Sequence, residues 1–302
     1  MNDSEIVLET KGLHKEYGRI TAVNELDLQI ERGSVFGLLG PNGSGKTTTL
    51  GMVLDIIRPS KGHYKWFGKE PTHHQRKRVG AILEKPNFYP KLSAEKNLEL
   101  ICKIKGVEKN RISEVLEQVG LKARSKDNFS TYSLGMKQRL AIGSALLAHP
   151  EVLILDEPTN GLDPEGIAEI RSLIIDIAQS GKTILLASHL LDEVQKVCNE
   201  FAILRKGSLI HHGRVDTGFG DDVIIELGSL DLVSLRAALD GFSPYVSSRL
   251  LKDRIEAKFV KDTDPTQVTE YLSGKQIYLS HLRVMTKDLE QQFMEILAEH
   301  EQ

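Results

Sequence analysis

The stretch from Gly40 to Thr47, GPNGSGKT, constrains the fold of this chain more than any other feature. It matches the pattern GxxxxGK[ST], and it lies between the apolar run 35–39 and a stretch with helical spacing, 47–57. The glycines let consecutive backbone amides turn toward a phosphate group, and the start of a helix adds positive potential. A glycine turn with a surface lysine, the alternative, would not require a strand before it and a helix after it. We therefore predict a phosphate-binding loop in which Lys46 reaches the β- and γ-phosphates and Thr47 can ligate Mg²⁺, built from Gly40, Pro41, Asn42, Gly43, Ser44, Gly45, Lys46, Thr47 and Thr48.

Length and composition indicate a two-domain globular protein of 302 residues. The hydrophobic share is 40% and the charged share 27%, which excludes a disordered chain. A formal charge of -3 does not favour a dedicated nucleic-acid binder. Cys102 and Cys198 form no CxxC pair, and we expect them to be buried core thiols in a reducing compartment. No run approaches 18 uncharged apolar residues, so we expect a cytosolic chain that does not itself span a membrane.

The sequence predicts an α/β domain at 1–217 and a smaller α+β domain at 221–302. The second part has 9 basic against 15 acidic residues, and two glycines and two acids interrupt the pattern at 217–222. In the first part, short apolar runs at 35–39, 151–155 and 182–187 are typical of strands buried on both faces of a parallel sheet. Helical spacing over Ser93 to Val119, punctuated by Gly106 and Gly120, predicts a helical subdomain, about 86–148, inserted between the strands.

The second part has the βαββαβ order of a ferredoxin-like domain. We expect strands at 222–227, 245–251, 254–260 and 276–282, and helices at 230–239, 265–272 and 289–299.

Two carboxylates, Asp156 and Glu157, follow the apolar run 151–155. The carboxyl ends of parallel strands form the edge of the sheet where ligands bind. Acids in such a position are often only solvated, but the predicted phosphate loop gives these two a function. We predict that Asp156 holds Mg²⁺ through water and that Glu157 polarises the attacking water.

The segment Tyr132–Arg139, YSLGMKQR, precedes this strand, and Ser133 occupies the position of a helix N-cap. With the phosphate loop, Asp156–Glu157, Asn160–Asp163 and Ser188–His189, this segment closely resembles the nucleotide-binding domain of ABC transporters over roughly residues 6–215. The resemblance implies a P-loop NTPase fold and a head-to-tail homodimer with two ATP molecules and Mg²⁺ at its interface.

The resemblance also implies roles for individual residues. Ser133 and Gly135 would contact the γ-phosphate bound to the other protomer, and Asp163 would link the two sites across the interface. His189 would brace Glu157 and the water, although a lone histidine is more often structural. Tyr17 lies where the family stacks an aromatic ring on adenine, and the alternative for Tyr17 is a core aromatic.

Two departures from the family pattern narrow the resemblance. The usual LSGGQ is here Tyr132–Met136, YSLGM, and the usual glutamine of another strand is Glu84, which can still ligate Mg²⁺ as an oxygen donor. Together with Asn87–Pro90, NFYP, these substitutions resemble the bacitracin-export and lantibiotic-immunity subgroup of peptide-antibiotic exporters.

We therefore expect the ATPase subunit of a bacterial ABC exporter on the inner face of the cell membrane, working with a separate membrane permease and not with nucleic acid. Two alternatives stay open: a soluble ABC ATPase with a non-transport partner, and a weakly hydrolysing regulatory subunit. The pairs His73–His74 and His211–His212 have no partner at ligand spacing, so we interpret them as solvated residues in loops or at strand ends.

Overall fold

The computed structural model describes residues 6–83, 87–215, 223–260, 263–285 and 293. The chain divides into two compact units, Met1–Val215 and Asp216–Gln302. Each unit has its own hydrophobic core, and each is described separately below.

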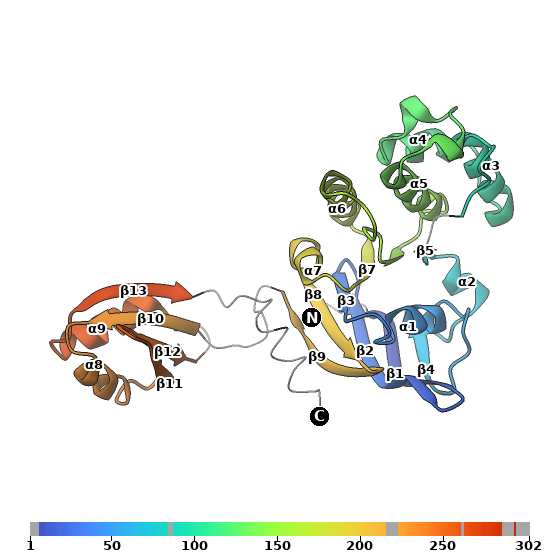
Figure 1. Cartoon of the computed structure of the whole chain (residues 1–302). Coiled ribbons are helices and arrows are strands. Elements are labelled where there is room, and N and C mark those ends of the chain that lie inside the picture. Colours follow the sequence, from blue (N-terminus) through green and yellow to red (C-terminus); the bar gives the residue numbers. More distant parts are fainter. Residues whose placement is uncertain (1–5, 84–86, 216–222, 261–262, 286–292, 294–302) are drawn as a thin grey trace. The chain divides into compact units, whose positions relative to one another are not determined.

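The first unit is built on a six-stranded sheet with the order β5-β6-β7-β3-β8-β9 (Figure 1). The first five strands in this order are parallel, and β9 pairs antiparallel with β8. The bounds are β3 Val35–Leu39, β5 Val79–Ile82, β6 Val152–Asp156, β7 Thr183–Ser188, β8 Glu200–Arg205 and β9 Ser208–Arg214. Every residue of β3, β6 and β7 is buried, which confirms the strands predicted from the three apolar runs.

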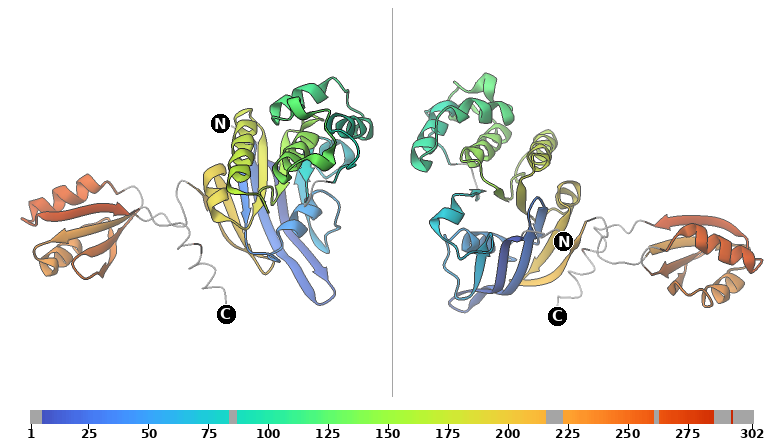
Figure 2. Two further views of the ribbon diagram at one scale, coloured as in Figure 1. Left: turned by 45° about the horizontal axis from the view of Figure 1, so that its top comes forward. Right: turned by 180° about the vertical axis from the view of Figure 1, so that it is seen from behind.

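A second, antiparallel sheet of this unit has the order β2-β1-β4 and is visible as the long blue strands in Figure 2. Its strands are β1 Ile6–Tyr17, β2 Ile20–Glu31 and β4 Lys61–Trp66. Leu50, Met52 and Val53 of helix α1, Lys46–Val53, belong to one core with apolar residues of both sheets. This core holds α1, and with it the predicted phosphate loop, against the main sheet.

Three helices gather in one part of the first unit, drawn in green in Figure 1: α3 Ala94–Lys105, α4 Arg111–Gln118 and α5 Leu134–Leu146. Gly106, with φ +66°, ends α3, so the predicted helical stretch is two helices. The other helices of this unit are α2 His73–Arg76, α6 Pro164–Gln179, α7 Leu191–Val197 and the short η1 Lys122–Arg124 and η2 Phe129–Thr131. Cys102 and Cys198 are buried free thiols, as predicted.

The second unit is a four-stranded sheet with the order β11-β12-β10-β13 and two helices packed on it (Figure 2). Its elements follow the predicted βαββαβ order, with bounds β10 Val223–Ser229, α8 Leu232–Leu239, β11 Tyr245–Leu250, β12 Ile255–Phe259, α9 Pro265–Gly274 and β13 Leu279–Met285. Alternating residues of the central strands, such as Ile225 and Ala257, form a core with Leu235 of α8 and Val268 of α9. Of the helix predicted at 289–299, only Phe293 belongs to the described residues.

Candidate active site

The predicted phosphate loop joins β3 to α1, because β3 ends at Leu39 and α1 begins at Lys46. Gly45 is the N-cap of α1 with φ +106°, and a Cβ atom there would lie 2.5 Å from the carbonyl oxygen of Ala22. Only glycine fits this turn without strain. The amide of Gly40 donates to the carbonyl oxygen of Ser188 at 3.3 Å, which ties the start of the loop to the end of β7.

Lys46 lies at the centre of the site and is only 5% exposed. Its Nζ donates to the carbonyl oxygens of Gly40 at 2.7 Å and Pro41 at 3.3 Å. The same nitrogen lies 3.2 Å from Oε1 of Glu157, an ion pair whose geometry is not that of a hydrogen bond. The ammonium group is thus held by groups that a phosphate could replace.

Asp156 and Thr47 approach each other from β6 and α1. Thr47 Oγ1 donates to Asp156 Oδ2 at 2.8 Å, and Asp156 is 2% exposed at the end of its strand. A hydroxyl and a carboxylate are hard oxygen donors of the kind that Mg²⁺ prefers. The residues present therefore fit a Mg²⁺ ion beside the phosphate loop.

Glu157 and His189 follow the ends of two neighbouring strands, β6 and β7. Oε2 of Glu157 lies 2.8 Å from Nδ1 of His189. The backbone of Glu157 has φ +49°, an uncommon conformation for this residue, and its amide donates to the carbonyl oxygen of Ala187 at 2.9 Å. The carboxylate thus lies between Lys46 on one side and His189 on the other.

Ser133, Gly135 and Asp163 lie together elsewhere, at the starts of α5 and α6. Ser133 and Asp163 are the N-caps of these helices, accepting from the amides of Met136 at 3.2 Å and Gly166 at 3.0 Å. They line a hollow of about 500 Å³ that includes no residue of the phosphate loop. In a single chain these residues therefore form a second surface, separate from the Lys46 site.

Tyr17 and Glu84 remain predictions. Tyr17 ends β1 with 49% of its surface exposed and Lys15 Nζ 4.9 Å from its ring centre, so it is not a core aromatic. Glu84 lies outside the described residues. In the aromatic segment that follows, Tyr89 is 65% exposed, whereas the ring centre of Phe88 lies 5.0 Å from that of Phe129.

Asn97 is a functional candidate that sequence reasoning missed. It is 2% exposed on α3, and its side chain accepts from the amide of Tyr89 at 2.8 Å and donates to the carbonyl oxygen of Tyr89 at 3.1 Å. This contact fixes the backbone from which the Tyr89 ring projects. An asparagine on the apolar face of a predicted helix was the available signal.

The predicted positions of the histidine pairs in loops or at strand ends were wrong, whereas three of the four side chains, those of His73, His74 and His212, are exposed as predicted. His73 and His74 form the first turn of α2, and His211 and His212 lie within β9. The ring of His211 stacks on Phe201 at 5.4 Å, and burial lowers its pKa. Among the residues that the structure describes, no three His, Cys, Asp or Glu side chains form a group that could hold a metal ion.

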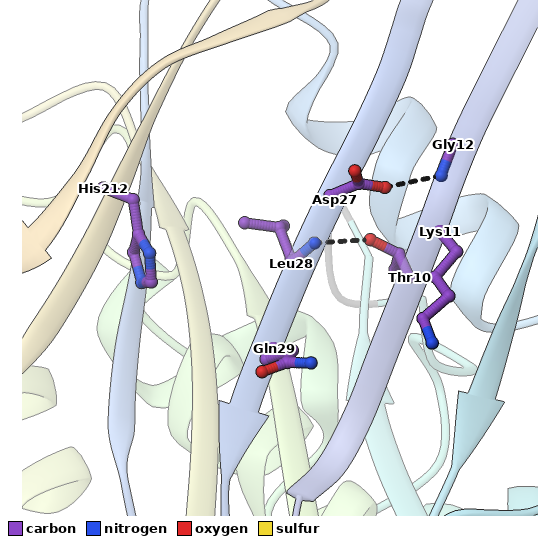
Figure 3. Close-up of a pocket in the computed structure, with 7 residues that line it drawn as sticks. All are labelled: Thr10, Lys11, Gly12, Asp27, Leu28, Gln29 and His212. Atoms are coloured by element: carbon purple, nitrogen blue, oxygen red, sulfur yellow. Dashed lines mark hydrogen bonds between the residues drawn. The ribbon is translucent and has the colours of Figure 1, made fainter.

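A hollow of about 530 Å³ beside β1, β2 and β9 involves none of the predicted site residues (Figure 3). Thr10 Oγ1 donates to the carbonyl oxygen of Leu26 and accepts from the amide of Leu28, at 2.9 and 2.8 Å. Asp27 accepts from the amide of Gly12 at 2.6 Å. These side chains hold β1 to β2 where the strand register shifts, so their polar groups are used within the sheet.

Comparison with known proteins defines the class of this chain. A family model described as "ABC transporter" matches residues 23–160. The uncharacterized ABC transporter ATP-binding protein YhcH of Bacillus subtilis (strain 168) is 40% identical over 97% of this chain and 96% of its own length. The chain therefore belongs to the ATP-binding subunits of ABC transporters, which hydrolyse ATP to power transport.

Two further comparisons place the chain within this class. It is 44% identical to the bacitracin transport ATP-binding protein BcrA of Enterococcus faecalis, over 68% of each protein, which confirms the resemblance to that subgroup. The structure of cbiO1 from Clostridium perfringens, part of the ABC transporter complex cbiONQ, covers 70% of this chain and 90% of its own, with 27% identity and a TM-score of 0.65. Within the described part of the chain, no helix has the length and apolar character that a membrane span requires.

Proposed function

We propose that residues 1–217 form the nucleotide-binding domain of an exporter ATPase and that residues 221–302 form an accessory domain. Two copies of the chain would bind two ATP molecules between them and drive a separate membrane permease from the inner face of the cell membrane. The observation that carries this proposal is the arrangement of Lys46, Glu157 and His189 beside the Thr47–Asp156 pair.

The chemistry follows from these contacts. Lys46 exchanges the carbonyl oxygens of the loop and the Glu157 carboxylate for the phosphates of ATP. Glu157, released from the ammonium group, takes the proton of the attacking water, and His189 holds the carboxylate in place. Mg²⁺, held by Thr47 and Asp156, would neutralise charge that develops on the phosphates.

A dimer is supported by the two separate surfaces of the chain. The phosphate loop offers Lys46 and backbone amides to one end of a nucleotide, and the hollow lined by Ser133 and Gly135 offers the start of α5. Head-to-tail pairing would bring the hollow of one copy to the phosphate loop of the other. Asp163, which lines the same hollow, would then lie at the interface.

The proposed substrate class is peptide antibiotics or related amphiphiles, because the relative from Enterococcus faecalis is named for bacitracin transport. The proposed contact with the membrane permease is the segment that follows Glu84, in which Tyr89 exposes 65% of its surface. Aromatic residues such as tyrosine are enriched at protein–protein interfaces.

A weakly hydrolysing regulatory subunit is the second candidate function. Leu134 stands where the family usually has glycine, and it is 44% exposed in the hollow lined by Ser133. An apolar side chain at this point leaves less room for a nucleotide bound to the other copy.

The test is to express the chain with its permease in a bacitracin-sensitive host and to measure both resistance and ATPase activity. We expect the pair to raise resistance, the Lys46→Ala variant to abolish the gain, and the reconstituted permease to stimulate hydrolysis several-fold. Hydrolysis that the permease does not stimulate would contradict the exporter function. Stimulated hydrolysis without resistance would contradict only the substrate class.

A further inference from the structure

Ser188 connects three parts of the site that are far apart in the sequence. It is fully buried at the end of β7 and directly precedes His189. Its hydroxyl donates to Oε2 of Glu193 at 3.0 Å and accepts from the amide of Leu190 at 3.1 Å. Its carbonyl oxygen accepts from the amide of Gly40 at 3.3 Å. The backbone on both sides of His189 is therefore tied to one hydroxyl group.

Glu193, on helix α7, is the less expected member of this arrangement. It is 4% exposed, and its Oε1 makes no hydrogen bond to any residue that the structure describes. Its carboxylate lies near the thiol of Cys198, whose pKa is raised by burial and by the charge of Glu193. A Cβ atom on Gly37 of β3 would lie 2.6 Å from a side-chain carbon of Val194, so α7 packs closely on the sheet next to Glu193.

The burial of this carboxylate calls for an explanation beyond a local turn. Removing a carboxylate from water is costly unless hydrogen bonds compensate fully. A serine hydroxyl that accepts from the amide two residues later already closes a turn of the backbone without help from a charge. Within the described chain, the Glu193 side chain makes only one hydrogen bond, which it accepts from the Ser188 hydroxyl.

We propose that Glu193 and Ser188 are positioning residues that hold the ring of His189 against Glu157. Glu193 fixes the direction of the Ser188 hydroxyl, so that its lone pair faces the amide of Leu190. The backbone at 188–190 then has one conformation, in which Nδ1 of His189 reaches Glu157 at 2.8 Å. This inference rests on the proposed function, because it requires Glu157 and His189 to act in hydrolysis.

The experiment compares Ser188→Ala, Glu193→Ala and Glu193→Gln in the full chain, with Asp192→Ala on the exposed side of the same helix as the matched control. We measure kcat and KM for ATP with Mg²⁺, and the melting temperature of each variant. Ser188→Ala and Glu193→Ala should lower kcat about tenfold and change KM less than twofold. Glu193→Gln keeps an acceptor for the hydroxyl, so its kcat should stay within threefold of the wild-type value.

A second comparison tests whether the pair acts through His189. If it does, Ser188→Ala should cause no further loss of kcat in a His189→Ala background. Losses that multiply in the double variant would overturn the proposal. An unchanged kcat with a lowered melting temperature would also overturn it, since the pair would then only stabilise the turn before α7. Wild-type hydrolysis by His189→Ala itself would instead refute the catalytic assignment on which the inference rests.

Discussion

Replacing Glu157 by glutamine should slow ATP hydrolysis and tighten ATP binding at the same time. The carboxylate lies 3.2 Å from Lys46 Nζ and 2.8 Å from His189 Nδ1. In the proposed site the phosphates of ATP need the same ammonium group, so we expect the carboxylate to compete with them for Lys46. Glutamine has the same shape but cannot compete as a charge or accept a proton from water.

The size of each effect follows from the geometry. At an effective dielectric constant of about 20, unit charges 3.2 Å apart attract by about 5 kcal/mol before desolvation, and the desolvation of a buried pair offsets most of this. If ATP must displace an ion pair whose net stabilisation is about 1–2 kcal/mol, removing that pair makes ATP binding about 5- to 30-fold tighter in the variant. Loss of a general base lowers kcat by about 10²- to 10⁴-fold, or about 3–5 kcal/mol in the activation free energy.

The assays are calorimetry with a non-hydrolysable ATP analogue, steady-state ATPase measurements, and size exclusion with ATP and Mg²⁺. We expect the variant to elute as a dimer that holds ATP. Glu117→Gln, an exposed change of the same chemistry on α4, is the control and should leave all three measurements unchanged. A monomeric variant that hydrolyses ATP within threefold of the wild-type rate would refute Glu157 as the base. Binding that weakens would refute the competition for Lys46.

Three further predictions concern the loop and the opposite end of the sheet. Lys46→Ala should weaken ATP binding at least 100-fold in calorimetry, since the buried charge that faces the phosphates is lost. Gly45→Ala should lower the melting temperature more than Gly43→Ala: both positions have positive φ, but only at Gly45 would a Cβ atom meet a backbone carbonyl oxygen, at 2.5 Å. Hydrogen bonds from Arg78 lower the pKa of Glu151 to about 2, so its stabilising effect is present above about pH 4.5 and is lost as the pH falls toward 2. Glu151→Gln should therefore lower the free energy of unfolding by about 1 kcal/mol at pH 7, and denaturant titrations should show this difference shrink between pH 5 and pH 3.

The strands of the main sheet could be predicted because burial on both faces of the sheet requires a continuous run of apolar residues in the sequence. Apart from Asp156 at the end of β6, every residue of β3, β6 and β7 is apolar or neutral, and the runs stop at turn residues. β1 and β2 carry no such signal. Their register shifts near Gly12 change which residues face the core, so the alternation of period two is interrupted along the strand. The antiparallel sheet was therefore missed.

The residues of the site also divide into those that the sequence predicts and those that it does not. The sequence places Lys46 after one strand and Glu157 after another, and both were predicted because parallel strands end at the same edge. The partners of Asn97 and Glu193 could not be predicted from the sequence, because only the packing of α3 and α7 brings Asn97 to the backbone of Tyr89 and Glu193 to the hydroxyl of Ser188.

In the strand order β6-β7-β3, β7 lies between the other two strands, which explains why residues at its end contact both parts of the site. Strands β6 and β3 are not neighbours, so a residue at the end of β7 is the one that can touch both of their ends. Ser188 contacts Gly40, which follows β3, and His189 contacts Glu157, which follows β6. Thr47 reaches Asp156 only because it lies on α1, which extends beyond the edge of the sheet. We therefore expect a displacement of α7 to act on the end of β7 through Ser188 and to shift Gly40 and Glu157 together.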